Sequence, residues 1–343
     1  MLKSRFNNFF MLKPGQFKHL STYLIAKEAE SRGINVKKMV TKGVYADGSL
    51  LEFCLGDKVE YMVGQRTSKT DSVAYWLQKN KYYAKIFLKK AGLSVSPGEI
   101  FNASDLDGIA AYAKKVGYPI VAKKTNGTHG SQVFVDIRDE TKLLEIAKNF
   151  SSNFLIEKMF VGTEYRMFVT RHRFVAATQR IPANVVGDGV STVERLVEIK
   201  NDDSRRSDGY STGLVKIKLD NYTDTVLSKQ GLSNRDVPKK GQPVFLRDNS
   251  NISTGGDSID VTDIVHPNVK KIAIEAVRAI PGLAYGGVDF LTSRTIAEKP
   301  DKDSYVIIEI NDSPMISMHH YPYSGKPRDA AGAIIDVLFP STK

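Results

Sequence analysis

The stretch "YVIIEINDSP", residues 305–314, places an acid and an amide in an otherwise apolar run. Its valine and isoleucine side chains favour a buried strand. Side chains alternate between the two faces of a strand, so Glu309 and Asn311 point to one face while Ile308 and Ile310 point to the other. Two oxygen-bearing side chains at a strand end are either hydrogen-bonded structure or ligands of a hard cation, and the rest of the chain must decide.

A second apolar stretch, "GGVDFL" at residues 286–291, also carries an acid in a predicted strand. After a hairpin return, Asp289 would join Glu309 and Asn311 as a third oxygen ligand. Mg²⁺ prefers carboxylate and carbonyl oxygens together with phosphate oxygens. A buried polar network is the alternative, but charged side chains are seldom buried without a partner or a metal. We therefore favour a metal–nucleotide site at these three residues.

The bulk composition is that of an ordinary globular protein, with 343 residues of which 41% are hydrophobic and 25% charged. A chain of this length can form two or three domains with a substantial core. Cys54 is the single cysteine, which excludes an internal disulfide and suits a reducing compartment. No apolar run approaches the ~18 residues of a membrane span. The opening "MLKSRFNNFFMLKPG" lacks the cleavage site of a signal peptide. We expect a cytoplasmic protein without a membrane partner.

The net charge of +11 arises from 49 Lys and Arg against 38 Asp and Glu. The basic residues are scattered, mostly as pairs such as Lys89-Lys90 and Lys239-Lys240, rather than gathered in a dense block. No nucleic-acid-binding motif accompanies them, so we do not expect a nucleic-acid partner. An anionic small substrate would explain the excess charge, and solvated surface lysines are the simpler explanation for most of the pairs.

Hydrophobic periodicity predicts an α+β protein. Helices are expected at 16–32, 80–93, 105–117, 140–150, 269–280 and 328–339, and strands at 34–40, 118–124, 131–137, 153–160, 163–170, 173–181, 284–291 and 305–311. We divide the chain into an N-terminal lobe (1–79), a smaller unit (80–160) and a larger unit (161–343). Residues 200–260 are polar and weakly periodic, which predicts a long functional loop.

The segment "VAKKTNGTHGSQV", residues 121–133, is a candidate phosphate-binding turn. Gly127 and Gly130 would let backbone N–H groups approach a phosphate, and Lys123 on the incoming strand could neutralise its charge. The alternative is a plain hairpin with a mobile loop, because short glycine motifs often occur in segments that bind no phosphate. The order G-x-x-x-x-G-K-[ST] of a P-loop is absent.

Two further segments carry candidate polar contacts. In "LIEKMFVGTEYRMFV" (155–169), exposed backbone could bind an adenine edge and Glu164 could hold ribose hydroxyls, although an ordinary crossover between domains is the alternative. In "LRDNSNISTGGDSID" (246–260), Arg247 offers a planar fork to a carboxylate or phosphate, although a polar loop with a solvated arginine is the alternative. Arg180, in "QRIPANVVGDGVST", is a second candidate arginine. The histidines show no zinc-ligand spacing, and no serine lies in a nucleophile-elbow pattern.

Taken in order, these stretches resemble the ATP-grasp carboxylate–amine ligases. The chain looks like the ATP-grasp part of cyanophycin synthetase and the glutathione-synthetase module of the bifunctional glutathione-forming enzymes. The resemblance spans residues 80–340 and is carried by "NKYYAKIFLKKAG", "PIVAKKTNGTHGSQV", "IEKMFVGTEYR", "PANVVGDGVST", "LRDNSNISTGGDSIDVTD", "GGVDF", "IIEINDSP" and "YPYSGKPRDAAGAIIDVLFP". It extends into the N-terminal lobe through "HLSTYLIAKEAESRGI" and "VEYMVGQRTSKTDS".

The resemblance implies an ATP-grasp fold in which two α+β lobes hold ATP and Mg²⁺. By position, it implies ATP contacts at Lys81, Lys123, Thr128, His129, Gly130, Ser131, Glu157, Lys158, Met159, Phe160 and Glu164. It implies metal ligation by Asp289, Glu309 and Asn311. The side that receives the substrates and the acyl phosphate would hold Arg180 and Arg247, together with Arg166, Asn251, Ser253, Thr254, Gly255 and Gly256.

The expected activity is ATP-dependent joining of a carboxylate to an amine through an acyl phosphate. The substrate would be an amino acid or a short acidic or γ-glutamyl peptide. A polyamide-extending ligase and a non-catalytic nucleotide-binding subunit are the alternatives, and self-association stays open. The chain shows neither the glutamate–cysteine ligase domain nor the Mur-ligase-like domain of these relatives, so we expect that the resemblance does not fix the substrate.

Overall fold

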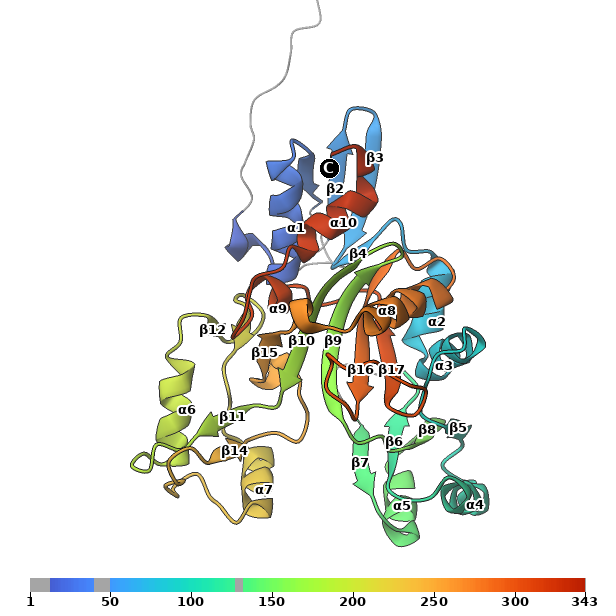
Figure 1. Ribbon diagram of the computed structural model, residues 1–343, viewed down its shortest axis with the longest axis vertical. Helices are drawn as coiled ribbons and strands as arrows, with labels where there is room; N and C mark the ends of the chain where they lie inside the picture. Colours follow the sequence, from blue (N-terminus) through green and yellow to red (C-terminus); the bar gives the residue numbers. More distant parts are fainter. Residues whose placement is uncertain (1–12, 40–49, 127–131, 343) are drawn as a thin grey trace, which may run out of the picture.

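The structure is a computed structural model that describes residues 13–39, 50–126 and 132–342. Three antiparallel sheets of four, four and five strands carry the architecture, and helices cover them (Figure 1). Each sheet comes from one of the three ranges 1–79, 80–160 and 161–343, which we propose as the subdivisions of the chain. Within the described residues, no helix is long and apolar enough to cross a membrane.

The N-terminal sheet follows helix α1 (Leu20–Ser31). Its strands lie in sequence order: β1 (Asn35–Lys38), β2 (Leu50–Leu55), β3 (Lys58–Val63) and β4 (Arg66–Thr67). The C-terminal helix α10 (Ala330–Leu338) packs beside α1 at the top of the molecule (Figure 1). Arg32, the residue that follows α1, donates to Asp336 of α10 at 2.7 Å. The C-terminal helix therefore shares a core with the N-terminal lobe, although it lies in the range 161–343.

The small sheet has the strand order β5-β8-β6-β7. Its strands are β5 (Gly98–Phe101), β8 (Phe154–Lys158), β6 (Ile120–Lys124) and β7 (Val133–Ile137). Helices α4 (Leu106–Val116) and α5 (Glu140–Ala147) cover it and share an apolar core with it. Two helices lead into the sheet, α2 (Ser72–Lys79) and α3 (Lys81–Lys90). Asn80 separates them and caps α3, accepting from Tyr82 N at 3.0 Å.

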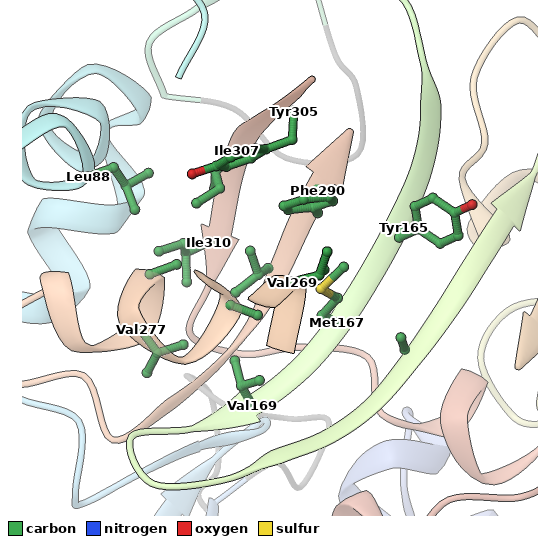
Figure 2. Close-up of a cluster of buried hydrophobic side chains, with 14 of the residues drawn as sticks. Leu88, Tyr165, Met167, Val169, Val269, Val277, Phe290, Tyr305, Ile307 and Ile310 are labelled. Carbon is green, nitrogen blue, oxygen red and sulfur yellow. The ribbon is translucent and has the colours of Figure 1, made fainter. Parts of the chain in front are cut away.

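The five-stranded sheet positions the residues of the opening motif. Its order is β15 (Asp257–Asp260), β10 (Phe174–Ile181), β9 (Thr163–Thr170), β16 (Tyr285–Thr292) and β17 (Tyr305–Asn311). Helix α8 (Pro267–Ala279) and α3 cover one face with an apolar cluster that contains Met167, Val277, Phe290 and Ile310 (Figure 2). The polar side chains of β16 and β17 are thereby left to the other face.

Residues 184–246 form a small lobe rather than the long loop expected for much of this range (Figure 1). Its elements are β11 (Asn184–Val186), α6 (Val193–Asn201), β12 (Arg206–Ser207), β13 (Leu214–Val215), α7 (Asn221–Lys229) and β14 (Pro243–Phe245). The prediction was wrong because few residues of α7 are apolar. Val226 and Leu227 carry its buried side, and a capping box of Asp220 and Thr223 starts the helix. Both ends of the lobe share one apolar core.

Short elements complete the chain: η1 (Pro14–Gln16), η2 (Ile252–Thr254), η3 (Thr262–Ile264), α9 (Ser317–His320) and η4 (Pro340–Thr342). The predicted strands at 163–170 and 305–311 are confirmed to the residue by β9 and β17. The predicted helix at 269–280 is confirmed as α8, which begins at Pro267, a residue suited to the first turn of a helix.

Candidate functional site

Three neighbouring strands bring the opening residues together. In the register of the sheet, Asp289 lies opposite Glu309 on β17 and opposite Arg166 on β9. Gly287 lies opposite Asn311. Directly paired residues share a face of the sheet, so the acids and the arginine form one polar row. The alternation inferred from "YVIIEIN" is observed from Glu309 to Asn311, with Ile310 in the apolar core on the far face. It fails at Ile308, because a β-bulge lets Ile307 join the core in its place.

A cavity of about 600 Å³ opens over this polar row. Eight of the residues predicted from the sequence line it: Lys81, Arg166, Arg180, Asn251, Ser253, Asp289, Glu309 and Asn311. They come from α3, four strands of the central sheet and the segment around η2. The cavity thus collects cations, acids and amides from positions more than 200 residues apart in the chain.

Glu309 is held ionised by its surroundings. Burial alone would raise the pKa of its carboxyl group, but the positive charges of Lys81, Arg166 and Lys123 outweigh burial and lower the pKa to about 2. Lys81 makes a direct ion pair with Glu309. Asn311 Nδ2 donates to Glu309 Oε1 at 3.3 Å, so its bonds within the described residues use the NH₂ group and leave the amide oxygen for a ligand.

Asp289 lies between two arginines. Arg166 binds both of its oxygens, with 3.0 Å between Nη2 and Oδ2, and Arg180 lies 3.3 Å from Oδ2. Arg180 also pairs with Glu164, which accepts from Ser250 as well. A carboxylate has about four lone-pair positions, so Asp289 can accept these contacts and still offer an oxygen to a cation.

The donor set fits a hard divalent cation. Two carboxylates and one amide oxygen on adjacent strands are the ligand types that Mg²⁺ accepts alongside phosphate oxygens. Among the described residues, no group of three His, Cys, Asp or Glu side chains forms a self-sufficient metal site. The cation would therefore need further oxygens from a bound ligand, as Mg²⁺ in nucleotide sites does.

Lys123 does not lie in the cavity. Its ammonium pairs with the carboxylate of Glu157, and so does the ammonium of Lys85. All three side chains are at most 8% exposed. Burial alone would raise the pKa of Glu157, but the two lysines outweigh burial and hold it below its usual value. Sequence reasoning missed Lys85, although its i,i+4 spacing from Lys81 puts both on one face of α3.

The predicted adenine-binding backbone is partly used by the protein itself. The N–H of Lys158 donates to Pro97 O at 2.9 Å, and that of Met159 donates to Pro119 O at 3.1 Å. The Lys158 ammonium donates to Gly117 O and Tyr118 O. The N–H groups of Lys158 and Met159 are therefore already engaged, which leaves them unable to bind an adenine edge in this conformation.

The structure does not bring Arg247 to the cavity. Its guanidinium is buried and donates to Thr223, to Asp220 at 2.8 Å and to Lys218 O at 3.1 Å. These bonds tie the segment after β14 to the start of α7, so Arg247 is engaged inside the small lobe in this structure and its catalytic role stays a prediction. A buried arginine cannot be distinguished from a ligand-binding one by its neighbours in sequence.

The other predicted substrate residues support the segment that lines the cavity. Thr254 Oγ1 donates to Asn251 O at 3.0 Å, and Gly256 N donates to the same oxygen at 3.2 Å. Gly255 has φ of 96°, a conformation that favours glycine. The predicted residues Thr128, His129, Gly130 and Ser131 lie outside the described residues.

Several cavity residues were not predicted from the sequence. Those with charged or aromatic side chains are Arg66, Tyr75, Lys79, Tyr210 and Asp312. Asp312 lies within the opening motif and could have been found from it. The others belong to β4, α2 and the small lobe, and no local pattern links these segments to the central sheet.

Glu309 should give folding stability a defined pH dependence. Its pKa of about 2 in the folded chain lies below the ~4.3 of an unfolded glutamate. Its stabilising contribution is therefore fully present above about pH 4.3 and is lost as the pH falls toward 2. We expect the thermal midpoint of the wild type to approach that of Glu309→Gln between roughly pH 4.5 and 2.5. A midpoint difference that stays constant over this range, measured by circular dichroism, would contradict the ion pair.

The chain is similar in sequence to several known proteins. A family model for the carbamoyl-phosphate synthase L chain, ATP binding domain, matches residues 80–212. The glutathione biosynthesis bifunctional protein of Clostridium perfringens is 36% identical over 348 residues, which covers 99% of this chain and 44% of that protein. Cyanophycin synthetase of a Nostoc species is 35% identical over 325 residues, which covers 94% of this chain and 35% of that protein.

A solved structure extends the comparison to the fold. The crystal structure of a bifunctional glutathione synthetase from Pasteurella multocida superposes with a TM-score of 0.73 at 35% identity. The match covers 95% of this chain and 44% of that chain. The chain therefore spans less than half the length of these relatives.

Proposed function

Because the chain belongs to the ATP-grasp family, we propose that it is an ATP- and Mg²⁺-dependent ligase that joins a carboxylate to an amine. The substrate is an amino acid or a short acidic or γ-glutamyl peptide. One observation carries the proposal: Lys81, Glu309, Asn311 and Asp289 converge on a single cavity. A lone cysteine and dependence on ATP suit a cytoplasmic location.

The reaction proceeds in two balanced steps. An oxygen of the substrate carboxylate attacks the γ-phosphorus of ATP, forming an O–P bond while the bond to the bridging oxygen breaks and ADP leaves. The amine nitrogen then attacks the acyl carbon, forming the amide while inorganic phosphate leaves and the amine loses a proton. Bound Mg²⁺ supplies charge neutralisation to the phosphates. Neither step requires a nucleophile from the protein.

The protein's part is positioning and charge. Lys81 neutralises phosphate charge, Lys123 joins it on turning away from Glu157, and Thr128, His129, Gly130 and Ser131 supply further ATP contacts. Glu309, Asn311 and Asp289 hold the cation, while Glu164 binds the ribose and the backbone at Glu157–Phe160 binds adenine. Arg166 and Arg180 already lie beside Asp289, where they can orient the acyl phosphate.

A product screen tests the proposal. The purified chain is incubated with ATP, Mg²⁺ and pooled amino acids and dipeptides, and new masses are identified. We expect ADP, phosphate and a product equal to the sum of two pool members minus water. ATP binding without ADP release across the panel would contradict a ligase and indicate a non-catalytic nucleotide-binding subunit.

The similarity to cyanophycin synthetase over 94% of this chain favours a second candidate, a ligase that extends a polyamide. The same spectra distinguish the two functions. A single addition gives one new mass, whereas a polyamide-extending ligase gives a ladder of masses separated by one repeating unit.

A further inference from the structure

One wall of the cavity has charged side chains to which the proposed reaction assigns no role. Arg66, Tyr75 and Lys79 line the cavity but belong to neither the metal-binding nor the phosphate-binding set. Arg66 lies on β4 of the N-terminal sheet. Tyr75 and Lys79 lie on α2 with i,i+4 spacing, so their side chains share one face of that helix. We call these three residues the α2 wall.

The guanidinium of Arg66 has a fixed orientation. Its Nε and Nη2 donate to the two oxygens of the buried Asp312, with 2.7 Å between Nη2 and Oδ1. Its Cζ lies 4.5 Å from the centre of the Tyr75 ring. Within the described ranges, no acceptor is bonded to its third nitrogen, Nη1. A guanidinium that is held by two hydrogen bonds to a carboxylate and by an aromatic ring presents its remaining N–H groups in a set direction.

Lys79 adds a second cation at the same aromatic ring. Its Nζ lies 5.2 Å from the centre of the Tyr75 ring and 5.0 Å from that of the Trp76 ring. Lys79 forms no ion pair in the part of the chain that the structure describes. Two cations beside one ring repel each other, and the ring offsets only part of that repulsion. With Asp312 counted, the wall keeps one net positive charge for an incoming anion.

We propose that the α2 wall binds a carboxylate of the substrate other than the one that is activated. This inference rests on the proposed function and narrows its substrate to molecules with at least two carboxylates. Nucleotide phosphate is the competing anion. In the proposed reaction, however, Lys81, Lys123 and the cation at Glu309 neutralise the phosphates. The α2 wall belongs to other elements, the N-terminal sheet and α2, and is therefore left for a different anion.

Lys79→Gln is the variant of choice, because the side chain is exposed and its loss should leave the fold intact. Lys90→Gln is a matched control. Lys90 is also exposed and lies 5.5 Å from the centre of an aromatic ring, that of Phe87, but it does not line the cavity. Arg66 is a poor choice, since its removal would leave the buried Asp312 without its partner.

The first readout is binding without turnover. Isothermal titration calorimetry is the measurement of choice, because the fluorescence of Trp76 depends on the Lys79 ammonium itself and would change in the Lys79 variant whatever its affinity. Glutarate, a plain dicarboxylate, is titrated in the presence of Mg²⁺ and ADP, with the uncharged glutaramide as control. We expect glutarate alone to titrate. Lys79→Gln should weaken its affinity about 10-fold, and Lys90→Gln should leave it unchanged.

The second readout is ADP release with glutamate, aspartate and dipeptides that carry two carboxylates. We expect Lys79→Gln to raise the KM for the acid about 10-fold while the KM for ATP stays unchanged. Glutarate affinity that is equal in the Lys79 and Lys90 variants would overturn the proposal, as would a rise in the KM for ATP alone. If glutarate binds as expected but no acid stimulates ADP release, the carboxylate site at the α2 wall is supported and the proposed ligase function is contradicted.

Discussion

Substitution of Glu309 by glutamine should reduce substrate-dependent ADP release by roughly 100-fold or more. Glutamine keeps the size of the side chain but removes the charge that pairs with Lys81 and that would hold the cation. Because the carboxylate is ionised well below neutral pH, the wild type presents this charge at every working pH. A coupled assay for ADP, with the identified acid and amine at saturation, measures the loss.

Two controls separate lost chemistry from lost structure. Glu275→Gln removes an acid that pairs with a cation on the surface of α8, and it should leave the rate unchanged. Glu309→Asp keeps the charge on a shorter side chain and should retain part of the activity. Full turnover by Glu309→Gln with an unchanged dependence on Mg²⁺ would show that the cation binds elsewhere.

Substitution of Lys85 by methionine should raise the KM for ATP by roughly 10- to 100-fold. This factor corresponds to the binding free energy of one charge-assisted hydrogen bond, the one that Lys123 would make to the phosphates. In the structure Lys85 and Lys123 share the buried Glu157. If Lys123 turns toward the phosphates, Lys85 still neutralises that carboxylate. Without Lys85, a departing Lys123 would leave a buried charge unpaired, which is strongly unfavourable. Lys85 is therefore a positioning residue that acts through Lys123.

The double variant Lys85→Met/Glu157→Gln distinguishes this role from a structural one. Removing the buried acid as well frees Lys123, so the KM for ATP should return most of the way to that of the wild type. Lys85→Arg should behave like the wild type, since it keeps the charge. A double variant as impaired as Lys85→Met, with a normal thermal midpoint, would refute the shared-acid account.

The sequence predicted the elements whose patterns are local. Strands β9 and β17 were placed to the residue because apolar runs bounded by polar turns mark them, and the polar row followed from strand alternation. The pairing of the strands that carry Asp289 and Glu309 was also inferred correctly, because strands that follow each other in the chain often pair, here across the loop at 293–304.

The remainder depends on contacts that no local pattern encodes. The packing of α10 on α1 joins the two ends of the chain, and the α2 wall joins β4 and α2 to the end of β17. The sequence around Arg247 and Arg180 does not distinguish them. In the structure Arg247 is hydrogen-bonded inside the small lobe, whereas Arg180 lines the cavity. Lys123 was placed correctly on its strand, but its pairing with Glu157 and Lys85 required the structure.

The most direct test is a crystal structure of the chain with Mn²⁺ and a non-hydrolysable ATP analogue, with the cation located by its anomalous scattering. Mn²⁺ accepts the same oxygen ligands as Mg²⁺. We expect the cation beside the side chains of Glu309, Asn311 and Asp289, bridging the terminal phosphates, with Lys81 turned from Glu309 toward those phosphates. A cation or triphosphate bound away from these three side chains would contradict the site proposed for this protein.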